Sequence, residues 1–171
     1  MHILRKISYG VLVVLSLTRL PLLAADVPDA ATPEFVLPVI GEEVPLPRIK
    51  EICTHYHLET LWRKIERDPP PRPFKSDGCT GWVNEWKGIS IYPAGFLHDL
   101  KYWAGYPGED VERLVADAEL MIDVARLLNS TAMAETMFHG VRVGGAEQLK
   151  VSFSWGFGRK KIESEPAKGG G

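Results

Sequence analysis

The sequence predicts an all-α fold, a small helical domain over residues 48–158 with an irregular or short-strand segment at its carboxy terminus. Apolar residues recur at helical spacing in several stretches, most regularly over about residues 109–129. Prolines and glycines stand where these stretches would begin or end. The length of 171 residues is typical of one domain.

The first 25 residues have the pattern of a signal peptide. Two basic residues precede an apolar run at 7–17, and Ala24 and Ala25 offer small residues for cleavage. Arg19 interrupts the apolar stretch, which is too short for a good transmembrane helix, although an uncleaved anchor is the alternative. We therefore expect a secreted or periplasmic protein, in a compartment where free calcium is plentiful and disulfides persist.

The next elements follow from proline and from helical periodicity. Residues 26–47 are rich in proline and alanine and are expected to form an extended or disordered arm, because proline fixes φ and lacks an amide donor. An imperfect apolar stripe predicts a first helix over residues 48–66, which the proline-rich stretch 69–73 ends. A loop over residues 74–86 follows.

Two antiparallel helices are predicted in the middle of the chain. Pro93 suits the first turn of a helix that ends near Gly105. The short turn at 106–108 leads into the clearest helix, at about 109–129, so that the two helices pack as antiparallel neighbours.

The remaining chain is less regular. Ser130 or Thr131 suits the amino-terminal cap of a fourth helix, which Gly140 would end. Residues 151–157 alternate apolar and small residues and predict either a short strand or a covering loop, and residues 159–171 a solvated tail. The formal net charge of −2 offers no electrostatic basis for nucleic-acid binding.

Asp117 is the most informative residue of the long helix. Leu114, Met121 and Val124 share its helical face, so the carboxylate is expected to be buried. A buried carboxylate without a partner is costly or becomes neutral, and an imidazole on the facing helix, that of His98, would supply a donor. The alternative is that Asp117 turns to the helix edge and is solvated.

His98 and Asp99 are consecutive, which on a helix sends their side chains about 100° apart. His98 can then face Asp117 while Asp99 points toward the preceding loop, with Tyr102 one turn further along. A lone His-Asp pair, by contrast, is typical of a helix surface.

The loop at 76–81 has the ingredients of a calcium site. Asp77 and Asp99 would supply negative charge, and glycines such as Gly78 let a backbone turn its carbonyl groups inward. The alternative is an ordinary Asp-Gly turn.

These motifs, taken together, resemble the secreted phospholipase A2 superfamily, and its compact bacterial and fungal members are the most similar in pattern. The resemblance covers about residues 74–130. The shared pattern is an Asp-x-Cys-Thr loop, a His-Asp-x-x-Tyr helix and an Asp in the next helix, which here are Asp77, Cys79, Thr80, His98, Asp99, Tyr102 and Asp117.

This resemblance implies calcium-dependent hydrolysis of the sn-2 ester of glycerophospholipids, with a phospholipid or membrane surface as substrate. His98 would be the general base on water, Asp117 would orient it, and Tyr102 would steady the network. Calcium would be held by three groups: Asp77, the Gly78 carbonyl and Asp99.

The cysteines depart from the family pattern. In that family a cysteine three residues before the histidine pairs with the loop cysteine, but this chain has Gly95 there. Cys53 and Cys79 are the two cysteines of the chain, so in an oxidising compartment the simplest interpretation is a disulfide between them. Otherwise the loop is not cross-linked.

Other functions stay open. Cys53, His55, His57 and Glu59 could form a zinc site only on a non-helical backbone, because a helix spreads them over different faces. The main rival is a non-catalytic calcium- or lipid-binding module of the same fold. The tryptophans suit either a lipid interface or the core, namely Trp82, Trp86 and Trp103.

Overall fold

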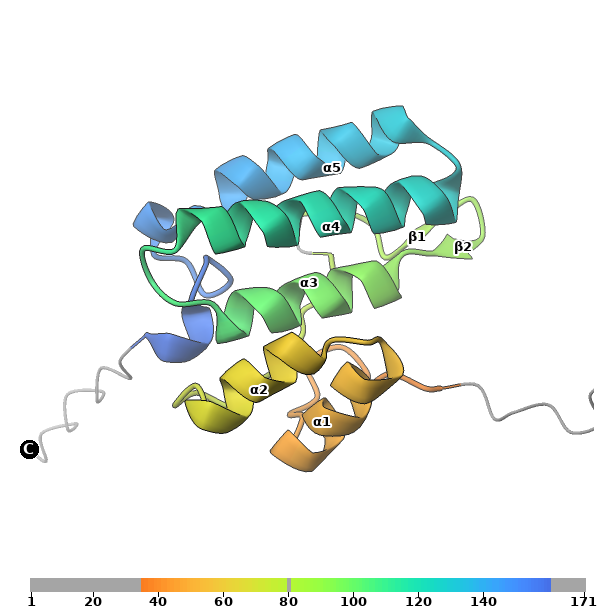
Figure 1. Cartoon of the computed structure of the whole chain (residues 1–171). Coiled ribbons are helices and arrows are strands. Elements are labelled where there is room, and N and C mark those ends of the chain that lie inside the picture. The colour runs from red at the N-terminus through yellow and green to blue at the C-terminus, as the bar shows by residue number, and fades with distance from the viewer. Residues whose placement is uncertain (1–34, 80, 161–171) are drawn as a thin grey trace, which may run out of the picture. The chain divides into compact units, whose positions relative to one another are not determined.

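The computed structural model describes residues 35–79 and 81–160. The predicted signal peptide, the start of the predicted arm and most of the predicted tail lie outside these residues. The described part forms five α-helices, one two-stranded hairpin and two short 3-10 helices, so the predicted mostly helical fold is confirmed (Figure 1). Within this part of the chain, every helix is too short or too polar to span a bilayer.

The predicted first helix is in fact two helices. α1 spans Leu46–His55 and α2 spans Glu59–Arg67. Between them His57 adopts a positive φ of 56°, and the amide of Leu58 donates to the carbonyl of Cys53 at 2.7 Å. The prediction of one continuous helix was therefore wrong. The break changes the direction of the chain, so that apolar residues of both helices face the same core.

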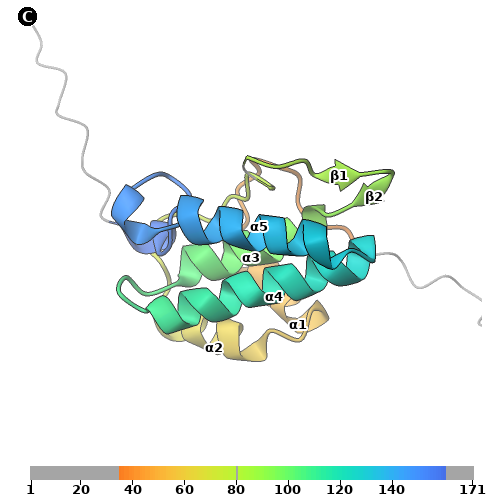
Figure 2. The ribbon, with the colours of Figure 1, turned by 90° about the horizontal axis from the view of Figure 1, so that it is seen from above.

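The next three helices lie side by side, and each runs antiparallel to the one before it (Figures 1 and 2). α3 spans Tyr92–Ala104, α4 spans Asp110–Leu128 and α5 spans Thr131–Gly144. Ser130 caps α5 as expected, its hydroxyl accepting from the amide of Met133 at 3.4 Å.

α5 continues past the end predicted for it. Gly140 lies inside the helix and not at its carboxy terminus, so that prediction was wrong. The last turn is held from α4, because the buried guanidinium of Arg113 donates to the carbonyl groups of Val141 and Arg142. A tertiary contact therefore outweighs the weak helix propensity of glycine.

A small hairpin lies within and just after the segment that we expected to be a loop. β1, Glu85–Trp86, pairs antiparallel with β2, Ile89–Ser90, with Trp86 opposite Ile89. Lys87 and Gly88 form the two-residue turn, both with positive φ, which matches the twist of the strands.

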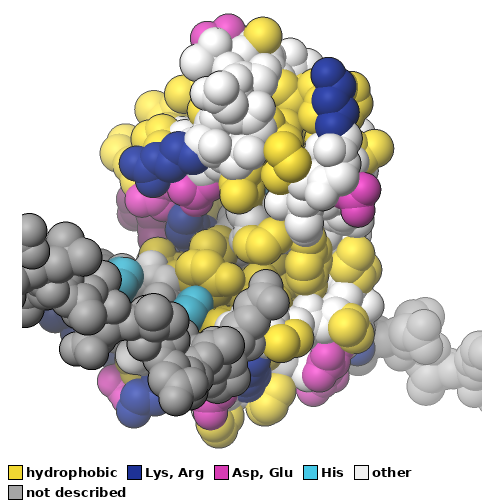
Figure 3. All heavy atoms as spheres, turned by 90° about the vertical axis from the view of Figure 1, so that its right-hand side faces the viewer, with side chains coloured by type: hydrophobic (Ala, Val, Ile, Leu, Met, Phe, Trp, Pro, Cys, Tyr) yellow, Lys and Arg dark blue, Asp and Glu magenta, His cyan; other side chains and the backbone are white. Residues whose placement is uncertain are grey.

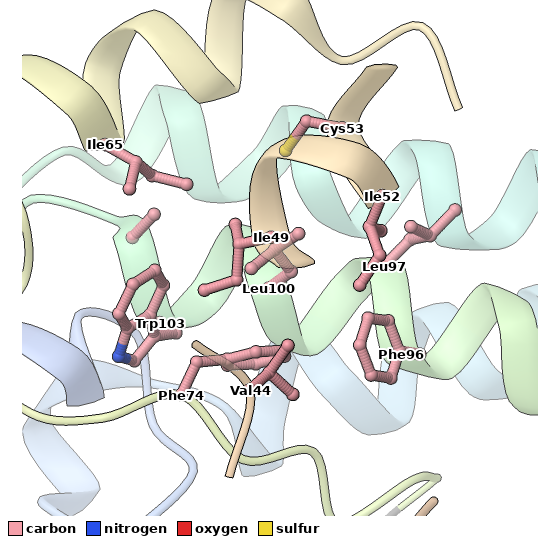
Figure 4. Packing of buried hydrophobic residues seen from close by; sticks show 11 residues of the cluster. Val44, Ile49, Ile52, Cys53, Ile65, Phe74, Phe96, Leu97, Leu100 and Trp103 are labelled. Atoms are coloured by element: carbon pink, nitrogen blue, oxygen red, sulfur yellow. The ribbon is translucent and has the colours of Figure 1, made fainter. Parts of the chain in front are cut away.

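The main core lies where α1 and α2 pack on α3. Figure 4 shows Ile49 of α1 beside Leu100 of α3 and Ile52 of α1 beside Leu97, with Ile65 of α2 on the side of Trp103. A second apolar cluster joins α3, α4 and α5. α3 is thus packed on both sides, as its nine buried residues out of 13 indicate.

The chain before α1 packs on the domain. The described part of the predicted arm contains a turn at Ile40 and Gly41 and ends in the first residues of α1. Phe35 stacks on His55 with ring centroids 4.0 Å apart. Val44 is buried and forms an isolated bridge with Phe74. These residues therefore belong to the domain.

The carboxy-terminal segment is a covering loop with a 3-10 turn at Phe157–Arg159 and not a strand. Trp155 is buried, and its indole nitrogen donates to the carbonyl of Tyr106 at 2.8 Å. Arg159, expected at the start of a solvated tail, instead pairs with Asp68 at 2.6 Å and donates to the carbonyl of Ala104. The hydrogen bonds of Trp155 and Arg159 hold this loop against the carboxy-terminal end of α3.

Candidate functional site

His98 and Asp117 form the centre of the site. The Nε2 atom of His98 on α3 lies 2.8 Å from Oδ1 of Asp117 on α4. Asp117 is fully buried and His98 is 7% exposed. The predicted pairing across the two helices is confirmed, and the alternative of a solvated Asp117 at the helix edge was wrong.

The buried face of α4 is rotated from the one that we predicted. Leu114 is 46% exposed, whereas its neighbour Arg113 is buried. Arg113 turns inward because Asp117, one helical turn away, supplies a negative charge 3.8 Å from its Nε atom. Asp117, from which we predicted the buried face of this helix, thus also stabilises the buried cation Arg113 on that face.

Asp117 has further donors on both of its oxygens. The hydroxyl of Tyr102 donates to Oδ1 at 2.7 Å, and Nη1 of Arg142 on α5 donates to Oδ2 at 2.7 Å. Burial alone would raise the pKa of Asp117, but the hydrogen bonds from His98, Tyr102 and Arg142 hold that pKa below its ordinary value. Asp117 is therefore a carboxylate at neutral pH.

His98 is correspondingly neutral. Burial lowers its pKa below the ordinary value, although the charge and hydrogen bond of Asp117 act in the opposite direction. Because Asp117 is ionised, the Nε2 atom of His98 carries the proton of the short contact. The Nδ1 atom then has a free lone pair, and His98 lines a cavity. A neutral imidazole in this state can accept a proton from water.

Sequence reasoning missed both arginines. Arg142 lies beyond the predicted end of the fourth helix, and Arg113 is on the edge of the predicted apolar face of the third. The available signal was the need of a buried carboxylate for more than one donor. Nothing in the spacing indicates which cation would supply it.

The second half of the site is the loop before the hairpin. Asp99 points toward this loop, as predicted, and its Oδ2 atom accepts from the hydroxyl of Ser76 at 2.6 Å. The hydroxyl of Ser76 accepts in turn from the amide of Gly78 at 3.1 Å. Ser76, which we had not assigned, thus links the loop to α3.

Asn84 braces the same loop. Its Oδ1 atom accepts from the amide of Cys79 at 2.8 Å. Gly78 has a φ of +79°, and a Cβ at this position would lie 2.6 Å from Oδ1 of Asn84. Only glycine suits this position, both for its backbone conformation and for the close approach.

The loop brings two acids to one place. Asp77 is exposed and Asp99 is largely enclosed, and both line the cavity of His98. Burial raises the pKa of Asp99 well above its ordinary value against the opposing hydrogen bond from Ser76, and the charge of Asp77 adds to the rise. A bound cation would remove this penalty on the charged carboxylate.

The carboxylates fit a hard cation such as calcium better than a transition metal. Among residues 35–79 and 81–160, no three His, Cys, Asp or Glu side chains converge as a metal-binding group. Calcium takes many of its ligands from backbone carbonyls, so Asp77 of the loop and Asp99 of α3, next to a glycine-containing backbone, are compatible with it.

The possible zinc residues do not converge. Cys53 is fully buried in the main core, His55 stacks on Phe35, and the side chain of His57 is 90% exposed. His57 and Glu59 approach only to 3.9 Å. Because the helix breaks at this motif, Cys53 lies in the core while His57 is exposed to solvent.

The predicted Cys53–Cys79 disulfide is not formed. Both residues are free and buried, and they belong to different core clusters. Instead Cys79 faces Gly95, where an added Cβ would lie 2.7 Å from its sulfur. The cysteine that the family carries at this position would therefore point at Cys79.

The cavity that His98 lines is mostly apolar, apart from His98 and the two acids of the candidate site. It has a volume of about 310 Å³ and lies among α3, α4, α5 and the loop. Its hydrophobic lining includes Trp82, Leu120, Met137, Val141 and Phe153. Gly140 and Gly144 of α5 also line it, and a Cβ added at either would meet no atom within 4 Å.

The three tryptophans have different environments. Trp103 is 2% exposed and belongs to the core, so only its core alternative is correct. Trp82 and Trp86 are 36% and 37% exposed, next to the exposed Val83 and Ile89. On the face shown in Figure 3, hydrophobic side chains gather in the middle, with charged side chains above and below.

Comparisons with family models, with curated proteins and with solved structures give no match for this chain. Functional inference therefore depends on the geometry of the site.

Proposed function

We propose that this protein is a calcium-dependent phospholipase A2-like ester hydrolase in which His98 activates water. The observation that carries this proposal is the buried His98–Asp117 pair at 2.8 Å, in which His98 also lines an apolar cavity. A neutral histidine oriented by a buried carboxylate is the arrangement required of a general base.

The reaction follows from the protonation states of the pair. The Nδ1 atom of His98 takes a proton from water while the water oxygen attacks the ester carbonyl. Asp117 stabilises the imidazolium through its short hydrogen bond. The imidazolium then returns the proton to the leaving alkoxide as the carbonyl–oxygen bond breaks, which yields a fatty acid and a lysolipid.

Asp77, the Gly78 carbonyl and Asp99 would hold the calcium ion. Within the described residues Asp99 forms no ion pair with a cationic side chain, although it is a carboxylate in an enclosed position. A bound calcium ion would neutralise the substrate phosphate and stabilise the oxyanion of the transition state. The Ser76 and Asn84 hydrogen bonds hold the loop in place beside His98.

A lipid substrate is supported by the apolar surfaces at and around the cavity. The cavity presents aliphatic and aromatic side chains to any molecule that reaches His98. Trp82 and Trp86 are half-exposed on the hairpin segment, and amphipathic rings of this kind are favoured at a membrane interface.

The experiment is fatty-acid release from phospholipid vesicles, measured with calcium and with a calcium chelator. Wild type should release fatty acid only with calcium, and His98→Asn should lower the rate by at least about a hundredfold. His57→Asn is the matched control, because His57 is a solvent-exposed histidine remote from the cavity, and it should keep full activity. Equal release by wild type and His98→Asn would refute the proposal. Calcium-dependent vesicle binding without any release would favour the non-catalytic binding module.

A further inference from the structure

A second cavity adjoins the acid pair. Its volume is about 400 Å³, and it shares Asp77, Asp99 and Phe153 with the cavity of His98. His98 does not line it. The two cavities therefore meet at the proposed calcium ligands, one leading to the general base and the other away from it.

The second cavity differs from the first in charge. Arg72 and Lys75 line it together with Ser152 and Phe157, and Lys75 also lies 3.7 Å from Glu43. None of the described lysines or arginines lines the first cavity. If a divalent cation occupies the carboxylates, the charges that remain on its wall are positive.

Arg72 is held through its backbone, and among the described residues its guanidinium group has no partner. Its amide donates to the carbonyl of Gly158 at 3.1 Å, and its carbonyl accepts from the indole of Trp103 at 2.8 Å. Among the described residues its guanidinium forms no hydrogen bond or ion pair. A guanidinium without an intramolecular partner is available to bind an anionic oxygen.

Lys160 adds to the positive potential near Arg72. Its ammonium donates to the carbonyl of Val151 at 2.8 Å and to the hydroxyl of Ser154, neither of which is an acid. Burial lowers the pKa of Lys160, and the charge of Arg72 lowers it further. The charge of Glu147 acts on Lys160 in the opposite direction, so Arg72 and Lys160 share one region that also contains an acid.

We propose that the second cavity is a head-group subsite that selects anionic glycerophospholipids, with Arg72 as its main selectivity residue. This inference rests on the proposed function, because it places the lipid phosphate at the junction of the two cavities. An acyl chain then enters the cavity of His98, and the head group meets Arg72 and Lys75. A choline head group brings a positive charge to these cations and is disfavoured.

The test measures binding, so that it does not depend on turnover. Short-chain ether analogues of phosphatidylglycerol and phosphatidylcholine, which the enzyme cannot cleave, are titrated in calcium below their micelle concentration. Monomeric lipids remove any contribution from adsorption to a charged surface. We expect wild type to bind the phosphatidylglycerol analogue about tenfold more tightly, the effect of one charge interaction near a protein surface.

Two Arg72 variants and one control decide the outcome. Arg72→Gln should reduce the preference for the phosphatidylglycerol analogue to about twofold, and Arg72→Glu should reverse this preference. The control is Arg63→Gln, a change of an exposed residue on α2, which should leave the preference at the wild-type value. Equal binding of both lipids by wild type, or an unchanged preference in Arg72→Glu, would overturn the subsite. Selective binding without hydrolysis of the corresponding esters would instead reject the proposed enzyme activity and leave the subsite standing.

Discussion

The Nη1 atom of Arg142 lies 2.7 Å from Oδ2 of Asp117, the carboxylate oxygen that His98 does not contact. α5 is thereby joined to the oriented histidine of α3 through a side chain of α4. The same carboxylate serves as the orienting group of the proposed base and as a polar link between three helices.

Arg142→Gln should therefore destabilise the fold. It removes a charge-assisted hydrogen bond from a fully buried carboxylate, but Tyr102 and Arg113 stay in place, so we expect a loss of about 1–3 kcal/mol in the free energy of unfolding. Urea denaturation followed by circular dichroism measures it. Arg126→Gln is the control, because Arg126 is exposed and its contact with Asp123 is 3.8 Å, and it should change stability by less than about 0.5 kcal/mol. Equal losses in the two variants would contradict the buried role of Arg142.

Gly95→Cys should introduce a disulfide with Cys79. An added Cβ at Gly95 lies 2.7 Å from the sulfur of Cys79, close to the separation of about 3 Å that a disulfide imposes between these atoms. The bond would close a loop of about 15 residues and stabilise the oxidised protein by about 2–3 kcal/mol. Denaturation with and without a reducing agent measures the gain.

Gly95→Ala is the matched control for this change. Its methyl group meets the same sulfur without any bond to form, so the variant should be destabilised whether or not reductant is present. If the cysteine variant behaves like the alanine variant under oxidising conditions, Gly95 does not face Cys79 as described.

The wild-type thiols should be slow to react in the folded state. Burial raises the pKa of Cys53 to about 11, and the negative charge of Glu59 adds to the rise, so at pH 8 about one thiol in a thousand is ionised. Burial raises the pKa of Cys79 similarly, to about 11. In the folded protein at pH 8, a thiol reagent should label neither residue quickly. After unfolding without reductant, the same reagent should label two thiols per chain. No labelling after unfolding would mean that the disulfide exists after all.

Gly140 offers a separate test of the cavity. Because it lies inside α5 and an added Cβ meets no atom within 4 Å, Gly140→Ala should stabilise the protein by up to about 1 kcal/mol. Gly140→Phe should fill the cavity of His98 and lower the turnover of long-chain lipids several-fold more than that of short-chain ones. Turnover rates over a series of acyl lengths measure this, and a uniform effect at every length would show that acyl chains do not occupy this cavity.

Several features of the fold and site were predictable from local sequence signals. The periodicity around Asp117 and the short turn before α4 were enough to place this carboxylate opposite His98. The divergence of consecutive helical side chains was enough to send Asp99 to the loop, where it meets Ser76. These signals act over one or two helical turns, so they can be recognised from residues close together in the sequence.

Other features depend on contacts between distant segments. The break between α1 and α2 and the extension of α5 past Gly140 follow from packing that no local propensity records. The pairing of Arg142 with Asp117 joins residues 25 positions apart.

The sequence by itself determined the helical character of the domain and the pairing of His98 with a buried Asp117, because helical periodicity sets which side chains share a face. Only the tertiary structure decided what surrounds that pair. It brought two arginines to Asp117, left Cys53 and Cys79 apart in separate cores, and opened two cavities at Asp77 and Asp99. The physical reason is that partners of a buried charge, and the spaces beside it, are set by how helices pack and not by the spacing along any one of them.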